Sequence, residues 1–361
     1  MKFDSIIEPA PDAMRQELDY LGRVNCPLRD RFSRAWQDFE GRYNQTQDPK
    51  VKGIVPKMMS GDGVDIYNNI SMIQNMEKHP AVFSDSGYGE FFTGSFLSDP
   101  AKQACFRQWP IRPEVCPQPV HPLFRDLDLR DPKGLFSIFA AMPYVLLVNH
   151  ARLKGRPAPR RIADLTNPLY EGSLGSVFAA DDVSELLLME IAKEQGEAGI
   201  RALARNIGFT GRAPDIAADA LGNRGGCCGY FMSWFFAHAV PKRDYLEIVW
   251  PEDGAVLNPL YALIKKDLTS PQRAAAEWLF SRELGQVMAE GWFAHVNSGV
   301  NHALPADARI RWVGWDYLYE KGLIPRIREI EAVYYDERRR VRPEENAVPQ
   351  TYVQTCLPAD R

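Results

Sequence analysis

The longest apolar run of the chain, GLFSIFAAMPYVLLVN at residues 134–149, limits most strongly what the chain can fold into. A membrane-spanning helix needs about 20 consecutive apolar residues, and this run is shorter. It also contains Pro143, which disfavours a continuous helix. Its β-branched and aromatic residues are typical of buried strands. We therefore interpret the run as two strands rather than as a membrane span.

Strand-like segments alternate with helical patterns over most of the chain. Strands are predicted over residues 51–55, 64–68, 135–141, 144–149, 174–180, 228–234, 246–250 and 261–266. Helices are predicted over residues 183–196, 197–208 and 270–292. Ser270 is the expected N-cap of the last helix, with Pro271 at its first position. This alternation predicts an α/β fold.

The two ends of the chain have different patterns. Residues 12–22 begin with Asp and end with Gly, and residues 26–44 place apolar side chains on one helical stripe. These patterns predict a helical extension over residues 1–45. Residues 336–361 are polar and contain proline, and we predict an extended tail there.

Composition excludes several classes of function. The chain has 43 Lys and Arg against 47 Asp and Glu, a net charge of −4, which gives no electrostatic case for a nucleic-acid partner. The first residues lack the apolar segment of a signal peptide, so the sequence as written indicates the cytoplasm, or the periplasm if a leader has been removed. The six cysteines match neither a zinc ribbon nor a CxxC motif, and they are too sparse for a disulfide scaffold.

Residues 141–199 carry a pattern of a known family. A strand ending in Asn precedes a P-x-x-x-x-DL-x-x-P-x-Y-x-G stretch, and a strand, an acidic loop and a helix follow. The residues at the fixed positions of this motif are Pro159, Asp164, Leu165, Pro168, Tyr170 and Gly172. A second block at 249–286 contains PEDG, a strand and a helix that ends in S-x-E-x-G-Q. The chain resembles the type II periplasmic-binding-protein family, the extracytoplasmic solute receptors of ABC transporters, and most closely its iron(III)-receptor-like branch.

The resemblance covers roughly residues 50–320 and implies a two-lobed α/β fold with a ligand cleft between the lobes and two crossing strands. Lobe one would combine residues 46–140 with 255–335, and lobe two would span residues 141–254. Ligands of open α/β sheets bind beyond the carboxyl ends of strands, near helix N-termini, and hinge closure then buries them.

The function that the resemblance implies is solute binding without turnover. The ligand would be a small molecule, a metal ion such as iron or zinc, or a metal-containing or cationic solute. The partner would be an ABC-transporter permease, and the protein would act as a monomer. A cytoplasmic metal or metallocofactor carrier is an alternative, and a sensor that signals through the amino-terminal helices is another. A cysteine-dependent enzyme would need a histidine beside Cys227 or Cys228, from among His238, His295 and His302.

Two loops that follow strands are the first candidates for ligand contacts. Ser60, Gly61, Asp62 and Gly63 offer backbone N–H groups and a carboxylate, or they form an ordinary turn. Asp181, Asp182 and Ser184 either cap the following helix or face the cleft. Acidic residues at a helix N-terminus would repel an anion, and they indicate a metal or a cationic group.

The stretch NRGGCCGYFMSWFFAHAV at residues 223–240 is the third candidate. Thiolates suit zinc, iron or copper(I), but Cys227 and Cys228 would point to opposite faces of a strand. We expect one thiol to face the cleft and the other the core, while simple packing or redox chemistry of the pair stays open. If this segment is a strand, Tyr230 and Trp234 share one face of it, so they line the cleft together or not at all.

Glu252 and Asp253 of the return crossing are the fourth candidates, with an ordinary Asp-Gly turn as the alternative. The loop at residues 83–96 is a further segment that could reach the rim of the cleft. Iron(III) receptors of the family that the chain resembles commonly bind iron through two adjacent tyrosines in the second lobe. This sequence departs from that pattern, because its Tyr-Tyr pair, Tyr334–Tyr335, lies close to the carboxyl terminus and outside the matched region. Phenolate-bound iron(III) is therefore not supported by the sequence.

Overall fold

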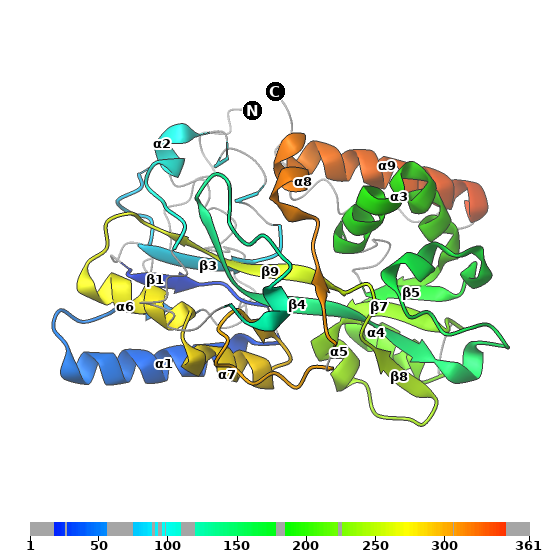
Figure 1. The fold of residues 1–361 in the computed structure, drawn as a ribbon, viewed down its shortest axis with the longest axis horizontal. Coiled ribbons are helices and arrows are strands. Elements are labelled where there is room, and N and C mark those ends of the chain that lie inside the picture. Colours follow the sequence, from blue (N-terminus) through cyan, green and yellow to red (C-terminus); the bar gives the residue numbers. More distant parts are fainter. Residues whose placement is uncertain are drawn as a thin grey trace, which may run out of the picture.

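The computed structural model of the protein describes residues 18–25, 27–55, 75–88, 91–92, 96–97, 99–109, 120–177, 185–222, 226–305 and 307–343. The chain forms two α/β lobes that lie side by side and share one twisted sheet (Figure 1). In the described part of the chain, every helix is too short or too polar to traverse a lipid bilayer. The predicted two-lobed α/β fold is thus confirmed.

Eleven described strands make up the sheet, and its main path has the order β2-β1-β3-β9-β4-β7-β5-β6. Strands β8 and β10 pair with β4, and β11 pairs with β9. The strands are β1 (Tyr20–Gly22), β2 (Gly53–Ile54), β3 (Val82–Ser86), β4 (Phe136–Asn149), β5 (Leu174–Val177), β6 (Ile207–Gly211), β7 (Gly229–Ser233), β8 (Leu246–Val249), β9 (Ala255–Ile264), β10 (Ala294–His295) and β11 (Ile310–Arg311).

The described helices cover both faces of this sheet. The α-helices are α1 (Arg29–Thr46), α2 (Pro100–Gln103), α3 (Glu185–Asn206), α4 (Ala213–Ala220), α5 (Trp234–Ala239), α6 (Ser270–Leu279), α7 (Arg282–Glu290), α8 (Gly314–Glu320) and α9 (Leu323–Val341). Short 3-10 helices are η4 (Pro122–Phe124), η5 (His150–Arg152), η6 (Ile162–Thr166) and η7 (Pro168–Tyr170).

Strand β4 is a single strand, so the prediction of two strands around Pro143 is wrong. It pairs with β9 from Phe136 to Tyr144 and with β7 from Tyr144 to Val148, and it therefore runs through both lobes. Pro143 lies where the neighbour of β4 changes from β10 to β7, a position between two ladders where a missing N–H is tolerated. Strands β4 and β9 are the crossing strands that the resemblance implied.

Two other expected helical regions are divided. Gly196 has a φ of 62° and breaks α3, as the Gly between the two predicted helices indicated. The region predicted as one helix over 270–292 ends at Leu279 and restarts at Arg282 with Ser281 as N-cap. The N-cap of α6 is Thr269, not Ser270, and Thr269 forms a capping box with Gln272.

Among the described residues 18–45, the predicted helical extension is instead a strand and a helix that belong to lobe one. Residues Tyr20–Gly22 form β1, which lies between β2 and β3 in the sheet. Helix α1 packs beside α7, and Trp36 of α1 contacts Tyr20 and Trp278 at ring distances of 4.5 and 5.2 Å. The predicted boundary at residue 45 is therefore wrong, because both elements belong to the core of lobe one.

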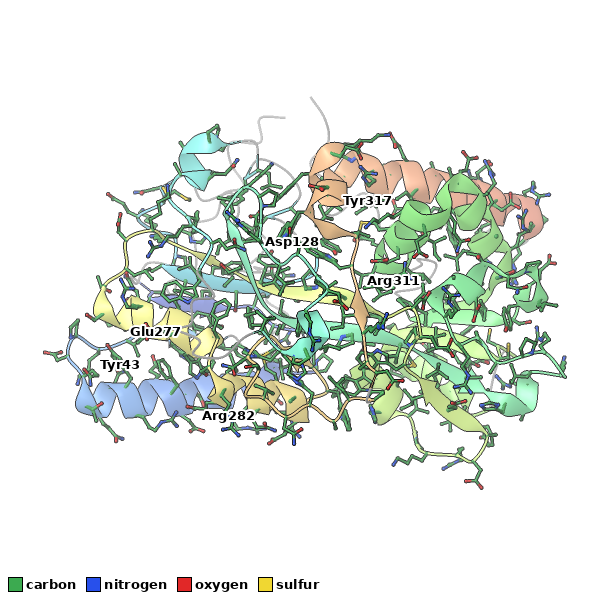
Figure 2. The ribbon with its side chains drawn as sticks, viewed as in Figure 1. Tyr43, Asp128, Glu277, Arg282, Arg311 and Tyr317 are labelled. Atoms are coloured by element: carbon green, nitrogen blue, oxygen red, sulfur yellow. The ribbon has the colours of Figure 1, made fainter. Side chains whose placement is uncertain are left out.

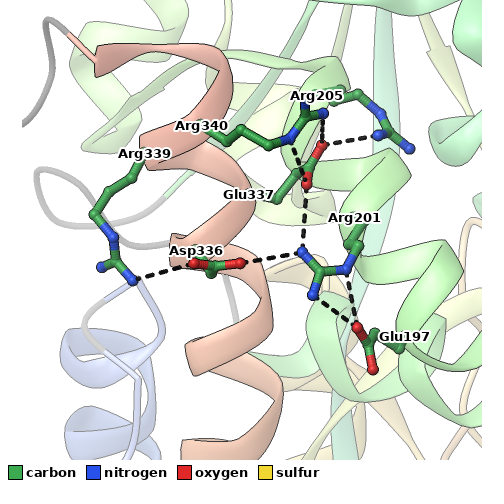
Figure 3. A network of polar contacts seen from close by, with 7 residues as sticks. All are labelled: Glu197, Arg201, Arg205, Asp336, Glu337, Arg339 and Arg340. Carbon is green, nitrogen blue, oxygen red and sulfur yellow. Dashed lines mark hydrogen bonds and ion pairs between the residues drawn. The ribbon is translucent and has the colours of Figure 1, made fainter.

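The carboxyl-terminal helix also differs from the prediction. Helix α9 continues to Val341, where an extended tail was expected from residue 336, and it packs along α3 of lobe two (Figure 1). Its buried Glu337 pairs with Arg201 and Arg205 of α3 and with Arg340 (Figure 3). The described residues that follow β11, up to residue 343, thus run from lobe one to lobe two and pack there against α3.

Candidate functional site

Five strands end at the region where β4 and β9 cross between the lobes. Strand β3 is antiparallel to β9 and ends at Ser86, opposite Leu260 in the middle of β9. Strands β1 and β2 are parallel to β3, so their carboxyl ends lie on the same side. In lobe two, β5 is parallel to β7, which is antiparallel to β4, so β5 and β7 end on the same side, and Ser233 at the end of β7 faces Tyr144. This arrangement is the one in which α/β sheets bind ligands.

The crossing strands have two faces that differ in what covers them. Tyr144 stacks on Phe231 at 5.1 Å, and Leu146 and Phe231 pack in the core beneath α3. Val145 and Leu147 point the other way, into a core with α4 and α5. We call these sides the α3 face and the α5 face.

Asn258 of β9 lies on the α3 face near Tyr144. Its pairing partner is Met142, which has the same orientation as Tyr144 two residues later on β4. The Asn258 side chain is 8% exposed, and its Oδ1 atom has no hydrogen-bond partner among the described residues. Gly87, with a φ of 76°, follows β3, and a Cβ atom at this position would lie 3.4 Å from this oxygen. A buried amide oxygen without a partner is costly, so it indicates a place for a donor from a ligand or water.

Two tyrosines flank this position. Like an ordinary tyrosine, Tyr144 is protonated and able to donate at neutral pH, and burial raises its pKa to about 12, which further disfavours a phenolate. The hydroxyl oxygen of Tyr88 accepts a hydrogen bond from Trp312 Nε1 at 2.5 Å. Burial raises the pKa of Tyr88 as well, and the nearby carboxylates of Glu190 and Glu185 raise it further.

Arg311 joins the segments that surround this region (Figure 2). Its guanidinium binds Glu190 at 2.9 Å, Asp253 at 3.0 Å and Glu194. The Arg311 side chain is 11% exposed and Glu190 is 4% exposed, so this is a largely buried ion cluster. It connects β11 with α3 and with the turn between β8 and β9.

The carboxylate of Asp253, which was predicted to contact the ligand, bonds instead to other groups of the protein. Its two carboxylate oxygens accept from the backbone N–H groups of Ile162 and Ala163 at the start of η6, and one also binds Arg311. Glu252 is exposed, and its backbone N–H donates to Arg160. The structure thus gives Asp253 a capping and pairing role and leaves the Glu252 carboxylate at the surface.

Tyr230 and Trp234 do not share a strand face. Strand β7 ends at Ser233, and Trp234 is the first residue of α5. Tyr230 is fully buried on the α5 face, where its hydroxyl donates to Asp219 at 2.5 Å and accepts from Arg152. The expected shared strand face is wrong, because Ser233 caps a helix where the strand was expected to continue, and both rings pack in the α5-face core.

The cysteines precede β7 at the end that points away from the crossing. Asn149, the last residue of β4, donates its backbone N–H to Cys228, and Cys228 donates its own to Ser173. The expected position beside the cleft is therefore wrong, since five residues of β7, about 16 Å, separate the thiols from Tyr144 and Ser233. Cys227 packs in the α5-face core and Cys228 in the α3-face core, so the expected opposite orientation is confirmed.

The chemistry of the thiols fits packing. Burial and Asp219 raise the pKa of Cys227 to about 12, and burial raises the pKa of Cys228. Within the described ranges, no three His, Cys, Asp or Glu side chains form a group suited to a metal ion. His295 bonds to Leu279 and His302, and His238 stacks on Trp292. Metal binding by Cys227 or Cys228 remains a prediction for which these residues supply no further ligand.

The remaining predicted residues lie outside the described ranges, and they follow strands that end at the crossing. Ser60, Gly61, Asp62 and Gly63 come after β2, and Asp181, Asp182 and Ser184 come between β5 and α3. Sequence reasoning missed Tyr144 and Asn258 as candidates. Both lie inside long apolar strands, and the one available signal was a polar side chain within an otherwise apolar run.

Residues 77–321 match the sequence model of a family described as bacterial extracellular solute-binding protein. The chain belongs to this family. No curated protein sequence matches the chain. This solute-binding protein has the fold of solved ferric-binding proteins. It is 15% identical to the Bordetella ferric binding protein, with a TM-score of 0.60 and coverage of 89% of this chain and 99% of that one.

Two further structures have the same fold as this solute-binding protein. A Pasteurella haemolytica apo ferric ion-binding protein A is 13% identical with a TM-score of 0.61, covering 89% and 98% of the two chains. A Trichodesmium protein in complex with iron and citrate is 16% identical with a TM-score of 0.57, covering 90% and 99%. The family and these neighbours are solute-binding transport proteins, not enzymes, and their type implies a small ligand and a permease partner.

Proposed function

We propose that this solute-binding protein of the ABC-transporter type closes its lobes on a small metal-containing or cationic solute, bound on the α3 face of the crossing strands. The observation that carries the proposal is the partnerless Oδ1 of Asn258, buried beside Gly87 where five strands end. The loops with Ser60 to Gly63 and Asp181, Asp182 and Ser184 would complete the site. Hinge bending of β4 and β9 would bring the two sides together.

The hydrogen-bonding groups at this position favour a metal that is already bound in a chelate over a free metal ion. Asn258 and Tyr144 offer neutral oxygen atoms, since burial raises the pKa of Tyr144 and disfavours a phenolate. The described residues hold no group of three metal-ligating side chains. A metal that arrives as a chelate brings its own donors, and its organic part accepts or donates hydrogen bonds. The Trichodesmium neighbour with iron and citrate supports iron(III) citrate as the first ligand to test.

Isothermal titration calorimetry and thermal unfolding will test this function. Iron(III) citrate is compared with citrate alone, zinc chloride and putrescine. A ligand present at 100 times its Kd stabilises the folded state by about 2.7 kcal/mol, which raises the melting temperature. The expected result is a rise with iron(III) citrate and not with citrate. No response to any of the four compounds would contradict the proposed ligand class.

Variants place the ligand on the molecule. Tyr144→Phe and Asn258→Leu remove one hydrogen-bonding group each, and each is expected to weaken binding about tenfold or more. Tyr43→Phe is the matched control, because Tyr43 lies on α1 at the outer side of lobe one (Figure 2). Equal affinities of all three variants would place the ligand elsewhere. Size-exclusion chromatography with light scattering will test the proposed monomeric state.

A further inference from the structure

Four aromatic side chains form a cluster on the α5 face, opposite the proposed ligand position. They are Trp234, His238, Trp250 and Trp292, and we call them the aromatic clamp. The imidazole of His238 lies flat on Trp292, with ring centres 3.6 Å apart and planes 5° apart. Trp234 contacts both Trp250 and Trp292 edge to face, at 5.2 and 5.1 Å.

The members of the aromatic clamp come from both lobes. Trp234 and His238 belong to α5, which packs on β4 and β7 in lobe two. Trp292 lies between α7 and β10, and β10 pairs with the lobe-one half of β4. Trp250 follows β8 of lobe two, and its Nε1 donates to the backbone oxygen of Arg309 at 2.8 Å. The clamp is therefore an inter-lobe contact.

Trp292 keeps an unfavourable backbone conformation within this contact. Its φ is 63°, in the left-handed region that a bulky residue rarely occupies. Backbone hydrogen bonds at the end of α7 hold it, because Trp292 donates to Ala289 and Phe293 donates to Met288, the Schellman pattern in which the residue after the C-cap is left-handed. The stack on His238 and the edge contact with Trp234 are the contacts that hold the ring in place. The end of α7 thus fixes the backbone of Trp292, and its ring lies at a contact between the lobes.

The position of the clamp decides what it does to the hinge. Tyr144 and Asn258 lie on the α3 face of β4 and β9, whereas the core that Trp250 and Trp292 join lies on the α5 face. Helix α5 is accordingly on the opposite side of β4 from α3 (Figure 1). Rotation about the crossing strands that narrows the α3 side widens the α5 side. The stacked pair must then separate as the lobes close.

We propose that the aromatic clamp holds the ligand-free protein open and thereby sets its affinity for the solute. This regulation rests on the proposed closure of the lobes. The apparent Kd of a ligand equals its intrinsic Kd divided by the populated fraction of the binding-competent state. Weakening a contact that exists only in the open state increases that fraction. Loss of the stack therefore tightens binding without any change in the residues that touch the solute.

Small-angle X-ray scattering of the ligand-free protein tests the clamp directly. His238→Ala removes the stack, and His238→Phe keeps a flat ring in the same place. We expect a smaller radius of gyration for His238→Ala and the wild-type value for His238→Phe. An unchanged or larger radius for His238→Ala would overturn the proposal. Trp292→Gly, which removes the ring and relieves the backbone strain, is the second variant if His238→Ala does not fold.

Titration with iron(III) citrate gives the second readout. His238→Ala is expected to bind about tenfold more tightly than the wild type, and His238→Phe equally well. If iron(III) citrate binds none of the proteins but the radius still falls in His238→Ala, the proposed ligand is wrong and the clamp stands. If it binds wild type and His238→Ala with equal affinity, the clamp does not set affinity and the proposal fails.

Discussion

Neighbouring residues in this chain have separate environments, and the adjacent cysteines are the clearest case. Cys227 and Cys228 are both less than 3% exposed, yet each thiol packs in a different core, one on each face of the sheet. A strand places successive side chains on opposite faces, so the two thiols cannot meet on one ion. Burial also keeps them protonated, and the nucleophilic and metal-binding form of cysteine is the thiolate.

The reactivity of the thiols follows from this burial. In the native protein at pH 8, we expect iodoacetamide to label Cys105, which is half-buried, and to leave Cys227 and Cys228 unlabelled. In urea, all three are expected to react. Peptide mapping by mass spectrometry measures the labelling at each position. Rapid native labelling of Cys227 or Cys228 would show an accessible thiolate and would favour the metal site that the sequence suggested.

At the scale of elements, the contact between α3 and α9 depends on one buried carboxylate. Glu337 is 2% exposed and accepts from Arg201, Arg205 and Arg340 (Figure 3). These hydrogen bonds and charges lower the pKa of Glu337 from 4.5 to about 2. Arg338 adds bonds to the backbone oxygens of Ala204 and Ile207 at the end of α3. The carboxyl-terminal helix is thereby tied to lobe two.

Glu337→Gln tests this contact through its pH dependence. The folded pKa is below the unfolded value, so the ionised carboxylate stabilises the fold above about pH 4.5, and this contribution is lost as the pH falls through about 2. We expect the variant to lose about 2 kcal/mol at pH 7. Urea unfolding from pH 7 to pH 2.5 measures both proteins. A difference that stays constant over this range would rule out the charged form of Glu337 as its source.

At the scale of the whole molecule, the lobes are joined by more than the two crossing strands. The segment from β11 to α9 is a third connection, because it begins beside β9 and ends on α3. Arg311 fixes its start through Glu190, Glu194 and Asp253. Asp253 in turn caps η6 in lobe two. Closure of the lobes therefore has to carry this segment along or rearrange the Arg311 cluster.

Removal of Arg311 tests how much of the whole fold depends on this cluster. Arg311→Ala leaves three acidic groups without their common partner, and loss of one member of a buried ion pair costs about 3 kcal/mol or more. We expect cooperative unfolding at a lower urea concentration. Arg339→Ala is the matched control, since Arg339 is half-exposed and pairs at 3.8 Å with the exposed Asp336, and its loss is expected to cost less than about 1 kcal/mol. Equal losses in the two variants would contradict a special role of Arg311.

The sequence by itself determined the class of fold and the family. The alternation of strands and helices predicted α/β lobes, and the motif around Asp164 and Tyr170 indicated the resemblance. The structure explains why that motif reports on the fold: Asp164 caps η6 by accepting from Arg160 and Arg161, and the Tyr170 hydroxyl donates to Pro157. These contacts lie within about a dozen residues of each other, so a local pattern is sufficient to encode them.

Only the tertiary structure decided which side chains are available at the crossing. Asp253 reads as a ligand group in the sequence, but Arg311 and the start of η6, far away along the chain, occupy it. The sequence predicts that the residues of α9 belong to lobe one and to a tail, but Arg201 and Arg205 of α3 pair with Glu337 and place the helix on lobe two. The physical reason is the same in both cases: a buried charge binds whichever opposite charge or backbone dipole the folding chain places beside it, and no local pattern specifies that partner.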